Sequence, residues 1–387
     1  MKKLLGNFNW PLFASMLALI AIGALTIRSA GAVRSAAFHD MWLSTLQTSL
    51  FGLAVYLTLA FSDYRNYFSW FALPVYAFSL VLLVLVLLVG KSMMGGTRWL
   101  WFFQPSEIAK PCVLVFLAEV FGRREELFPG RFRFRGFLFA AAAAGLPALL
   151  IVLEPDLGTA LALAPAVVAV LLAAGVWRKG LVVLLAVGML AATAVLTAVY
   201  EAEKPGVDDA RRERILEYVP LKPHQVKRVK TFLFPESDQM ASGYNLRQAR
   251  MAIGSGGLWG KGYGKAETNQ LKYLPPAVSM NDFIFCVWAE EQGYMGSLLL
   301  LALFGVLALS CVHAAYVAAD FRGRLFAIGA ATLVFAHVYV NIAMSIGLVP
   351  ITGLPLPFIS LGRTFLITMM SALGIVQSIS IHREEIT

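Results

Sequence analysis

Residues 71–89 read FALPVYAFSLVLLVLVLLV and contain no charged side chain. A helix of about 20 apolar residues spans the hydrocarbon core of a bilayer, so this segment predicts a transmembrane helix. The whole chain is 59% hydrophobic and 14% charged, whereas soluble domains are about 45–50% apolar and about 25% charged. This composition excludes a soluble globular enzyme and, with 12% aromatic residues, a disordered chain. We therefore predict an all-α, polytopic integral membrane protein.

Nine further segments share the length and apolarity of 71–89, so we expect about ten transmembrane helices in one domain covering 1–387. The predicted spans are 10–27, 43–61, 71–89, 107–121, 137–153, 158–176, 181–199, 294–312, 325–347 and 364–381. The fourth span has the weakest signal because it contains three charged residues. A long loop, 200–293, separates the seventh span from the eighth and is expected to hold a charged helix over 208–218 and an amphipathic helix over 223–233.

The basic residues predict the orientation of the spans. With the N-terminus inside, the inner segments carry thirteen Lys and Arg residues and the short outer loops carry five. Positive residues favour the cytoplasmic side, so both termini are predicted in the cytoplasm and the loop 200–293 outside. The net charge of +9 follows from this bias and from contact with anionic membrane lipid, so it does not indicate a nucleic-acid partner.

Ionisable residues at membrane depth are costly, and the sequence places them mainly at the outer ends of the spans. The first group is QPSEIAKP at 104–111, where Glu107 and Lys110 are three residues apart and can pair on one helix face. Both are candidates for binding a substrate, with Lys110 on a lipid phosphate. An internal ion pair that allows the helix to pack is the alternative.

The second group is EPDLGT at 154–159, which places Glu154 and Asp156 in a tight outer turn. Two such carboxylates suit a divalent cation or a sugar hydroxyl. The alternative is that Asp156 caps the helix that follows, and one residue can serve both purposes.

The third group is the glycine-rich segment GSGGLWGKGYG at 254–264. It matches neither a phosphate-binding P-loop nor a dinucleotide-binding motif. Its successive backbone N–H groups are suited to an anion site beside Lys261, and a flexible hinge is the alternative.

The fourth group is NDFIF at 281–285, where Asp282 meets the start of an apolar helix. Burial against Phe283 and Phe285 would raise the pKa of this carboxyl, as a general base requires. The alternative is a helix cap formed by Asn281 or Asp282.

The last group is PITGLPLPFISLGR at 350–363, whose prolines and glycines prevent a continuous helix. Such a break is tolerated at membrane depth only where it is buried in protein or lines a cavity. Arg363 is a candidate for holding a diphosphate there. Together the groups predict a cavity open to the outer leaflet, with a ligand that is anionic at its head and amphipathic overall.

These segments resemble the SEDS family of cell-wall synthases, most closely its RodA branch. The matching stretches are FQPSEIAKP (103–111), EPDLGTAL (154–161), RVKTFLFPESD (228–238), GYNLRQARMAIGSGGLWGKGY (243–263), NDFIFCVWAEEQGYMGS (281–297) and GLPLPFISLG (353–362). They occur in the family's order and cover most of the chain.

The resemblance implies a peptidoglycan glycosyltransferase of the bacterial cytoplasmic membrane that polymerises lipid II, a disaccharide-pentapeptide on undecaprenyl diphosphate. It also implies a class B penicillin-binding protein as partner. The family's catalytic aspartate corresponds to Asp282, and its substrate-binding positions correspond to Glu107, Lys110 and Asp156. Ser360 opens a family motif that is altered in this chain, and it joins Lys261 and Arg363 as a candidate substrate ligand. A divalent cation, Mg²⁺ or Mn²⁺, is left open.

The chain departs from the family pattern near this site. The loop before Asp282 is two residues longer and lacks the usual Glu and His, and the arginine that often precedes FQPSE is absent. Three alternatives to the elongation enzyme stay open: a septal FtsW-type synthase, a flippase for lipid-linked precursors, and a non-catalytic scaffold for a penicillin-binding protein.

Overall fold

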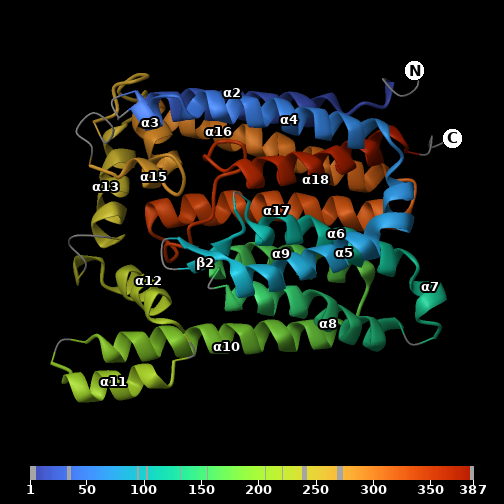
Figure 1. Ribbon diagram of the computed structural model, residues 1–387, viewed down its shortest axis with the longest axis horizontal. Helices are drawn as coiled ribbons and strands as arrows, with labels where there is room; N and C mark the ends of the chain where they lie inside the picture. The colour runs from blue at the N-terminus through green and yellow to red at the C-terminus, as the bar shows by residue number, and fades with distance from the viewer. Residues whose placement is uncertain are drawn as a thin grey trace.

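The computed structural model describes residues 6–32, 36–93, 96–101, 103–130, 132–154, 156–204, 206–219, 221–237, 242–267 and 273–383. Long helices dominate it and run side by side (Figure 1). They are α2 (Trp10–Gly31), α4 (Met41–Phe61), α5 (Tyr64–Val89), α6 (Pro105–Gly122), α8 (Phe132–Leu153), α9 (Leu157–Ala174), α10 (Arg178–Ala202), α16 (Ile284–Val317), α17 (Phe321–Ile346) and α18 (Arg363–Ile381).

The helices confirm the prediction of an all-α polytopic membrane protein. Among the described residues, nine helices are long and apolar enough to cross a membrane. The remaining long helix is α6, the predicted fourth span, whose charged side chains are buried inside the bundle. α5 and α16 begin before the predicted 71 and 294 because the helical backbone continues beyond the apolar stretch.

The predicted loop between α10 and α16 is folded into short helices. They are α11 (Asp209–Glu217), α12 (Pro223–Leu233), a 3₁₀ turn (Pro235–Ser237), α13 (Ser242–Ser255) and α15 (Pro276–Ser279). α11 and α12 confirm the helices predicted over 208–218 and 223–233. These helices lie at one end of the molecule, and the chain termini lie at the other (Figure 1).

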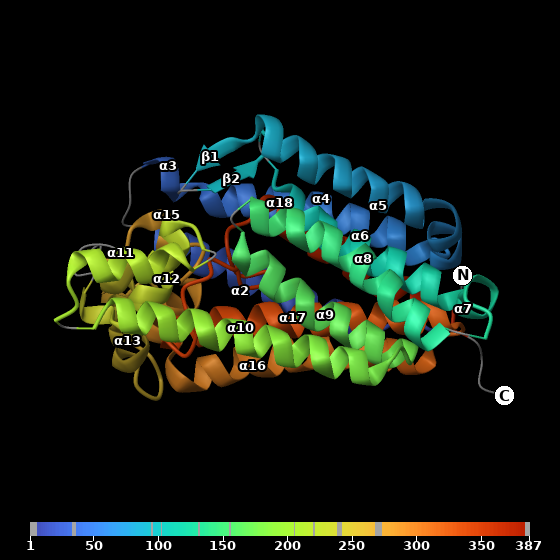
Figure 2. The same cartoon turned by 90° about the horizontal axis from the view of Figure 1, so that it is seen from below.

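Three smaller elements complete the described part of the chain. α3 (Ala36–His39) and α7 (Arg124–Leu127) are single turns. An antiparallel hairpin of β1 (Lys91–Met93) and β2 (Gly96–Trp99) was not predicted. The hairpin lies at the same end as α11, α12, α13 and α15 (Figure 2).

Helix ends follow local sequence chemistry. Asp63, Asp156 and Asp320 cap the N-termini of α5, α9 and α17, because each carboxylate accepts a hydrogen bond from a backbone N–H of the first turn. Gly175 and Gly347 end α9 and α17 with φ of 77° and 76°, a left-handed conformation that glycine adopts without steric cost.

α17 forms the centre of the bundle, and α10 lies at its edge (Figure 1). α17 packs against α6, α9, α16 and α18. α10 packs mainly against α11 and α12, and its residues from Val182 to Ala194 are exposed. An apolar helix exposed in this way is suited to lipid contact.

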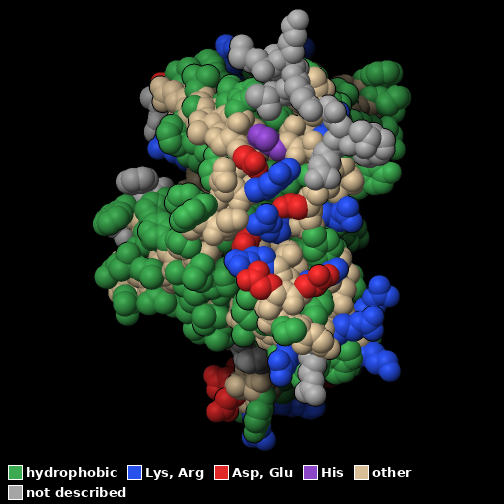
Figure 3. All heavy atoms as spheres, turned by 90° about the vertical axis from the view of Figure 1, so that its right-hand side faces the viewer, with side chains coloured by type: hydrophobic (Ala, Val, Ile, Leu, Met, Phe, Trp, Pro, Cys, Tyr) green, Lys and Arg blue, Asp and Glu red, His purple; other side chains and the backbone are tan. Residues whose placement is uncertain are grey.

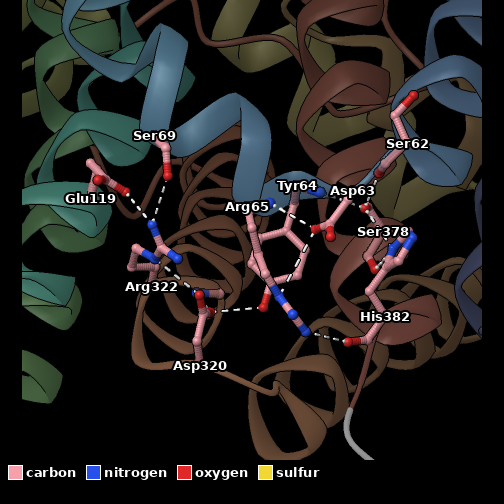
Figure 4. Close-up of polar contacts among 11 residues, drawn as sticks. Ser62, Asp63, Tyr64, Arg65, Ser69, Glu119, Asp320, Arg322, Ser378 and His382 are labelled. Carbon is pink, nitrogen blue, oxygen red and sulfur yellow. Dashed lines mark hydrogen bonds and ion pairs between the residues drawn. The ribbon is translucent and has the colours of Figure 1, made fainter.

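A polar network ties three helices together at the end that carries the termini (Figure 4). The Arg322 guanidinium contacts Glu119 (3.1 Å) and Asp320 (2.9 Å) and donates to Ser69 (3.0 Å). The Tyr64 hydroxyl donates to Asp320 (2.8 Å). A second polar cluster, which was not predicted, therefore joins α5, α6 and α17 at the end opposite the predicted groups.

The glycine-rich segment 254–264 packs into a break in α16. Gly293 has φ of 66°, and this break removes the helical hydrogen bonds that the carbonyls of Glu290 and Glu291 would otherwise accept. The backbone N–H groups of Lys261 and Gly262 donate to these two carbonyls at 3.0 and 2.9 Å. The segment therefore repairs the helix, and these N–H groups are not directed at an anion.

The repair is reciprocal. The N–H groups of Tyr294 and Met295 donate to the carbonyls of Gly257 and Leu258 at 2.9 and 3.1 Å. A Cβ at Gly260 would lie 2.1 Å from the Glu291 carbonyl oxygen, so glycine is required at this close approach.

We expect the variant Gly260→Ala to lower the thermal unfolding midpoint in detergent by several degrees. Its Cβ would meet a backbone oxygen, and its φ of 78° costs alanine about 1–2 kcal/mol before any clash is counted. The matched control is Gly254→Ala, which lies on α13 with no atom within 4 Å of its Cβ and should leave the midpoint unchanged or slightly raised. Equal midpoints for the two variants would show that the repair is unimportant.

Candidate active site

A cavity of about 200 Å³ opens at the end of the bundle opposite the termini. It is formed by β2, the first turns of α6, α9 and α18, one face of α12, and the two non-helical stretches that precede α16 and α18. Its polar lining is Arg98, Gln104, Glu107, Asp156, Thr159, Arg228, Asn281, Asp282, Arg363 and Thr364. The cavity therefore brings four of the predicted site residues together: Glu107, Asp156, Asp282 and Arg363.

Asp282 is held in the cavity wall by its backbone. Asn341 of α17 donates from its side-chain amide to the carbonyls of Asp282 (3.0 Å) and Leu354 (2.7 Å). These bonds join the two non-helical stretches and fix the position of Asp282. Asn341 carries no motif signal, and its role depends on contacts between distant segments.

Ser360 fixes the same junction from the other side. Its hydroxyl donates to the Asn281 carbonyl (2.7 Å) and accepts from the Leu356 backbone N–H (2.8 Å). Ser360 is buried and is not among the residues that line the cavity. The structure thus gives this predicted substrate ligand a positioning role.

The Asp282 carboxylate lines the cavity. Within the part of the chain that the structure describes, no side chain or backbone group forms a hydrogen bond or ion pair with it. Burial raises the pKa of Asp282 to about 6, while Arg228 and Arg98 act in the opposite direction. The buried side chains of Phe283 and Phe285 agree with the predicted environment. The cap of α16 is Phe283, without a side-chain hydrogen bond, so the helix-cap alternative for Asn281 and Asp282 was wrong.

Three arginines line the same cavity as this carboxylate. Arg228 of α12 donates to the Thr352 carbonyl at 2.9 Å. Arg98 of β2 lies 3.6 Å from an Asp156 oxygen. Arg363 begins α18, is exposed, and has no acid within ion-pair distance among the described residues. The guanidinium fork suits phosphate groups, so this set can hold a diphosphate.

Sequence reasoning predicted Arg363 but missed Arg98 and Arg228. The sequence predicts an amphipathic helix over 223–233, which contains Arg228, and a short outer loop that contains Arg98. The usual arginine before FQPSE is absent, and Arg98 supplies a guanidinium to the cavity from the hairpin. A signal was available for Arg228, because it opens the matching stretch RVKTFLFPESD.

Asp156 both caps α9 and lines the cavity. Its carboxylate accepts from the Thr159 backbone N–H (3.3 Å) and hydroxyl (2.8 Å), and from Gln104 (2.7 Å) and Ser106 (3.2 Å). The cap prediction is confirmed. With these partners and Arg98, the carboxylate fixes the first turn of α6 against that of α9.

Lys110 belongs to a buried group behind the cavity. Its ammonium contacts Glu107 at 2.7 Å and donates to the His337 ring at 2.8 Å. Lys110 is 1% exposed and does not line the cavity. The predicted ion pair is confirmed, and direct contact of Lys110 with a ligand stays a prediction that this burial does not support.

Lys261 lies outside the cavity. Its ammonium contacts Glu290 at 2.8 Å and Glu267 at 3.1 Å, which fixes the glycine-rich segment against α16. The structure therefore separates this predicted substrate ligand from the other candidates.

We expect Lys110→Met to destabilise the protein by about 3–5 kcal/mol, because it leaves the Glu107 carboxyl buried without its cation. The double variant Glu107→Gln/Lys110→Met removes both charges and should recover most of this loss, measured by unfolding in detergent. The control Lys204→Gln breaks an exposed pair with Glu201 and should leave stability nearly unchanged. A double variant no more stable than the single one would contradict a buried ion pair.

Residues 9–385 match the family of cell cycle proteins that comprises FtsW, RodA and SpoVE. The peptidoglycan glycosyltransferase MrdB of Escherichia coli (strain K12) is 35% identical over 373 residues, covering 95% of this chain and 93% of MrdB. The solved RodA of Thermus thermophilus, a rod shape determining protein, is 27% identical with a TM-score of 0.65 and 98% coverage of both chains. A chain from a peptidoglycan synthase complex that coordinates polymerization and crosslinking is 29% identical with a TM-score of 0.72, covering 97% of this chain and 98% of that one.

Proposed function

Since the chain belongs to the FtsW/RodA/SpoVE family of cell cycle proteins, we propose that it is a peptidoglycan glycosyltransferase that polymerises lipid II during cell elongation. The observation that carries the proposal is the Asp282 carboxylate, which lines a cavity together with Arg98, Arg228 and Arg363. A general base beside a set of guanidinium groups is what glycosyl transfer from a diphosphate requires.

The reaction assigns each group a role. Asp282 takes the proton from the 4-hydroxyl of the acceptor sugar as that oxygen attacks the anomeric carbon of the donor. The bond from the anomeric carbon to the diphosphate oxygen breaks, and undecaprenyl diphosphate leaves with the bonding electrons. Because the displacement is direct, an α-linked donor gives a β-linked product. The arginines hold the diphosphate and stabilise the charge that develops on it.

The described residues do not form a complete set of side-chain ligands for a divalent cation. Among the described residues, no group of three or more His, Cys, Asp and Glu side chains could hold a metal. Burial raises the pKa of Glu154 to about 9, which favours its protonated form at neutral pH. The Asp156 carboxylate already contacts Arg98 and accepts hydrogen bonds from its neighbours. Mg²⁺ or Mn²⁺ would therefore bind through Asp282 and the substrate phosphates. We propose that the arginines supply the larger share of positive charge.

The membrane setting supports an outward-facing active site. Both termini lie at the end opposite the cavity, where the Asn7 side chain contacts Ile381 (3.4 Å) and Arg383 (2.9 Å). We propose that this end is cytoplasmic, in the bacterial inner membrane, because the inner segments carry most of the basic residues. The loop 200–293 and the cavity then face outward, where lipid II and the growing glycan meet.

A class B penicillin-binding protein is the proposed partner. The support is the similar chain from a complex that coordinates polymerization and crosslinking. FtsW of Trichlorobacter lovleyi is 32% identical to this chain and MrdB is 35% identical. We propose the elongation role because MrdB has the higher identity and because the fold matches that of a rod shape determining protein.

Replacement of Asp282 by Asn should abolish polymerisation of labelled lipid II, with a loss of at least about 100-fold expected for a missing general base. The assay uses purified protein with and without a class B penicillin-binding protein. The control Asp209→Asn changes an exposed carboxylate of α11 and should retain full activity. Equal glycan synthesis by wild type and Asp282→Asn would refute the assigned base, and no synthesis by wild type with the partner present would favour a scaffold or flippase.

The pH dependence of polymerisation should show an acid limb near pH 6. The base acts when deprotonated, so a pKa raised to about 6 moves the loss of activity upward from the usual aspartate range. Arg228 lowers this pKa, so Arg228→Gln should shift the acid limb to higher pH, in addition to weakening substrate binding. An acid limb that does not move in Arg228→Gln would show that another group titrates.

A further inference from the structure

A second cavity lies at the end of the molecule that carries the termini. Its volume is about 1110 Å³, and it is bounded by α7, the first turns of α8 and the end of α9. An adjoining cavity of about 490 Å³ extends it to the start of α10. The two share Arg133 and Gly175, and their basic lining is Arg124, Arg133, Arg135, Arg178 and Lys179. We call this pair of cavities the basic basin.

Four cations of the basin have no acidic partner among the described residues. Arg133, Arg135, Arg178 and Lys179 are exposed, and within the described ranges no acid lies within ion-pair distance of them. Glu125 is the one acid among the described lining residues. By contrast, Arg322 is paired with Glu119 and Arg123 with Glu126. Figure 3 shows this end, with a line of alternating basic and acidic side chains across it and a group of basic side chains at its edge.

Backbone and aromatic contacts hold the walls of the basic basin together. The Trp177 backbone N–H donates to the Arg133 carbonyl at 3.0 Å, and the Trp177 ring packs edge-on against Phe134 and Phe137. These contacts join the α9–α10 connection to the start of α8. The four cations therefore occupy two helix starts that are held together.

Arg124 is fixed on the inner wall of the basin. Its guanidinium lies 4.3 Å from the centre of the Phe321 ring and donates to the Ala174 carbonyl at 3.0 Å. A guanidinium held over an aromatic ring keeps free donor positions for a second partner.

Apolar side chains continue from the cations into the membrane. Phe134 and Leu138 on α8 are 52% and 51% exposed. Val182 and Val183 on α10 are 64% and 59% exposed. Cations at the start of two spans, with exposed apolar side chains one turn further along, match a lipid whose phosphate lies at the interface and whose acyl chains lie in the hydrocarbon.

We propose that the basic basin binds the phosphate headgroup of an anionic phospholipid, with the acyl chains against α8 and α10. The proposal is independent of the glycosyltransferase site, which lies at the opposite end. The preference of basic residues for the cytoplasmic side would explain the positive charge at this end. It would not explain the cavity or the contacts that join the two helix starts.

The test is native mass spectrometry of the full chain in detergent, with phosphatidylglycerol or phosphatidylcholine added. Wild type should bind phosphatidylglycerol at least about tenfold more tightly. Arg133→Gln/Arg135→Gln should weaken this binding roughly 25-fold, since each interfacial cation strengthens the attraction to anionic lipid roughly fivefold. Arg133→Lys/Arg135→Lys keeps the charge and should retain most of the affinity.

The matched control is Arg211→Gln/Arg214→Gln, which removes two exposed arginines from α11 at the other end and should not change the affinity. Unfolding midpoints verify folding, and Arg178→Gln/Lys179→Gln supplies an independent double variant on α10. Equal binding of the two lipids, or equal loss in the control, overturns the proposal. Displacement of the lipid by soluble glycerol phosphate at equal concentration also overturns it, because the site would then be one for free phosphate.

Discussion

Backbone N–H and C=O groups that a broken helix leaves unpaired need other partners where they are buried, and this constraint governs two places where the chain leaves the helix. At Gly293, the glycine-rich segment supplies the carbonyls and N–H groups that the broken α16 lacks. Before α18, Asn341 binds the Leu354 carbonyl and Ser360 binds the Leu356 N–H. Because Asn341 and Ser360 also bind the backbone beside Asp282, they fix two distant segments relative to each other. The cavity wall forms because these two segments are held together.

Charged side chains near the site are likewise paired within the protein. The buried cation of Lys110 is matched by Glu107, and Lys261 is matched by Glu290. These pairs hold helices together and leave no charge for a ligand. Asp282 differs, because its partners lie at a distance and its carboxylate stays available. This contrast supports the proposal that Asp282 accepts a proton from the substrate.

The outcome for individual residues shows how much of the candidate site could be predicted from the sequence. Asp282 was predicted as the base mainly because the NDFIF stretch resembles the family's catalytic motif, while its position alone left a helix cap open. Lys261 was expected in the site because glycine-rich segments bind anions, but the segment had a second use that only the break at Gly293 reveals. Ser360 was expected to bind substrate and instead holds the backbone beside Asp282. Arg98 and Arg228 were missed as ligands because nothing in their local pattern shows that a hairpin and an amphipathic helix meet over one cavity.

The sequence by itself determined the ten long helices, their approximate bounds, and the candidate base, Asp282. These depend on apolar run length, on helix caps such as Asp156 and on the NDFIF motif, which are local properties. Tertiary structure alone decided which cations face Asp282, which candidates are buried in ion pairs, and that α10 stands at the edge of the bundle. The physical reason is that a side chain finds its partner far along the chain, as Asn341 does with the Asp282 carbonyl, and no local pattern encodes that distance.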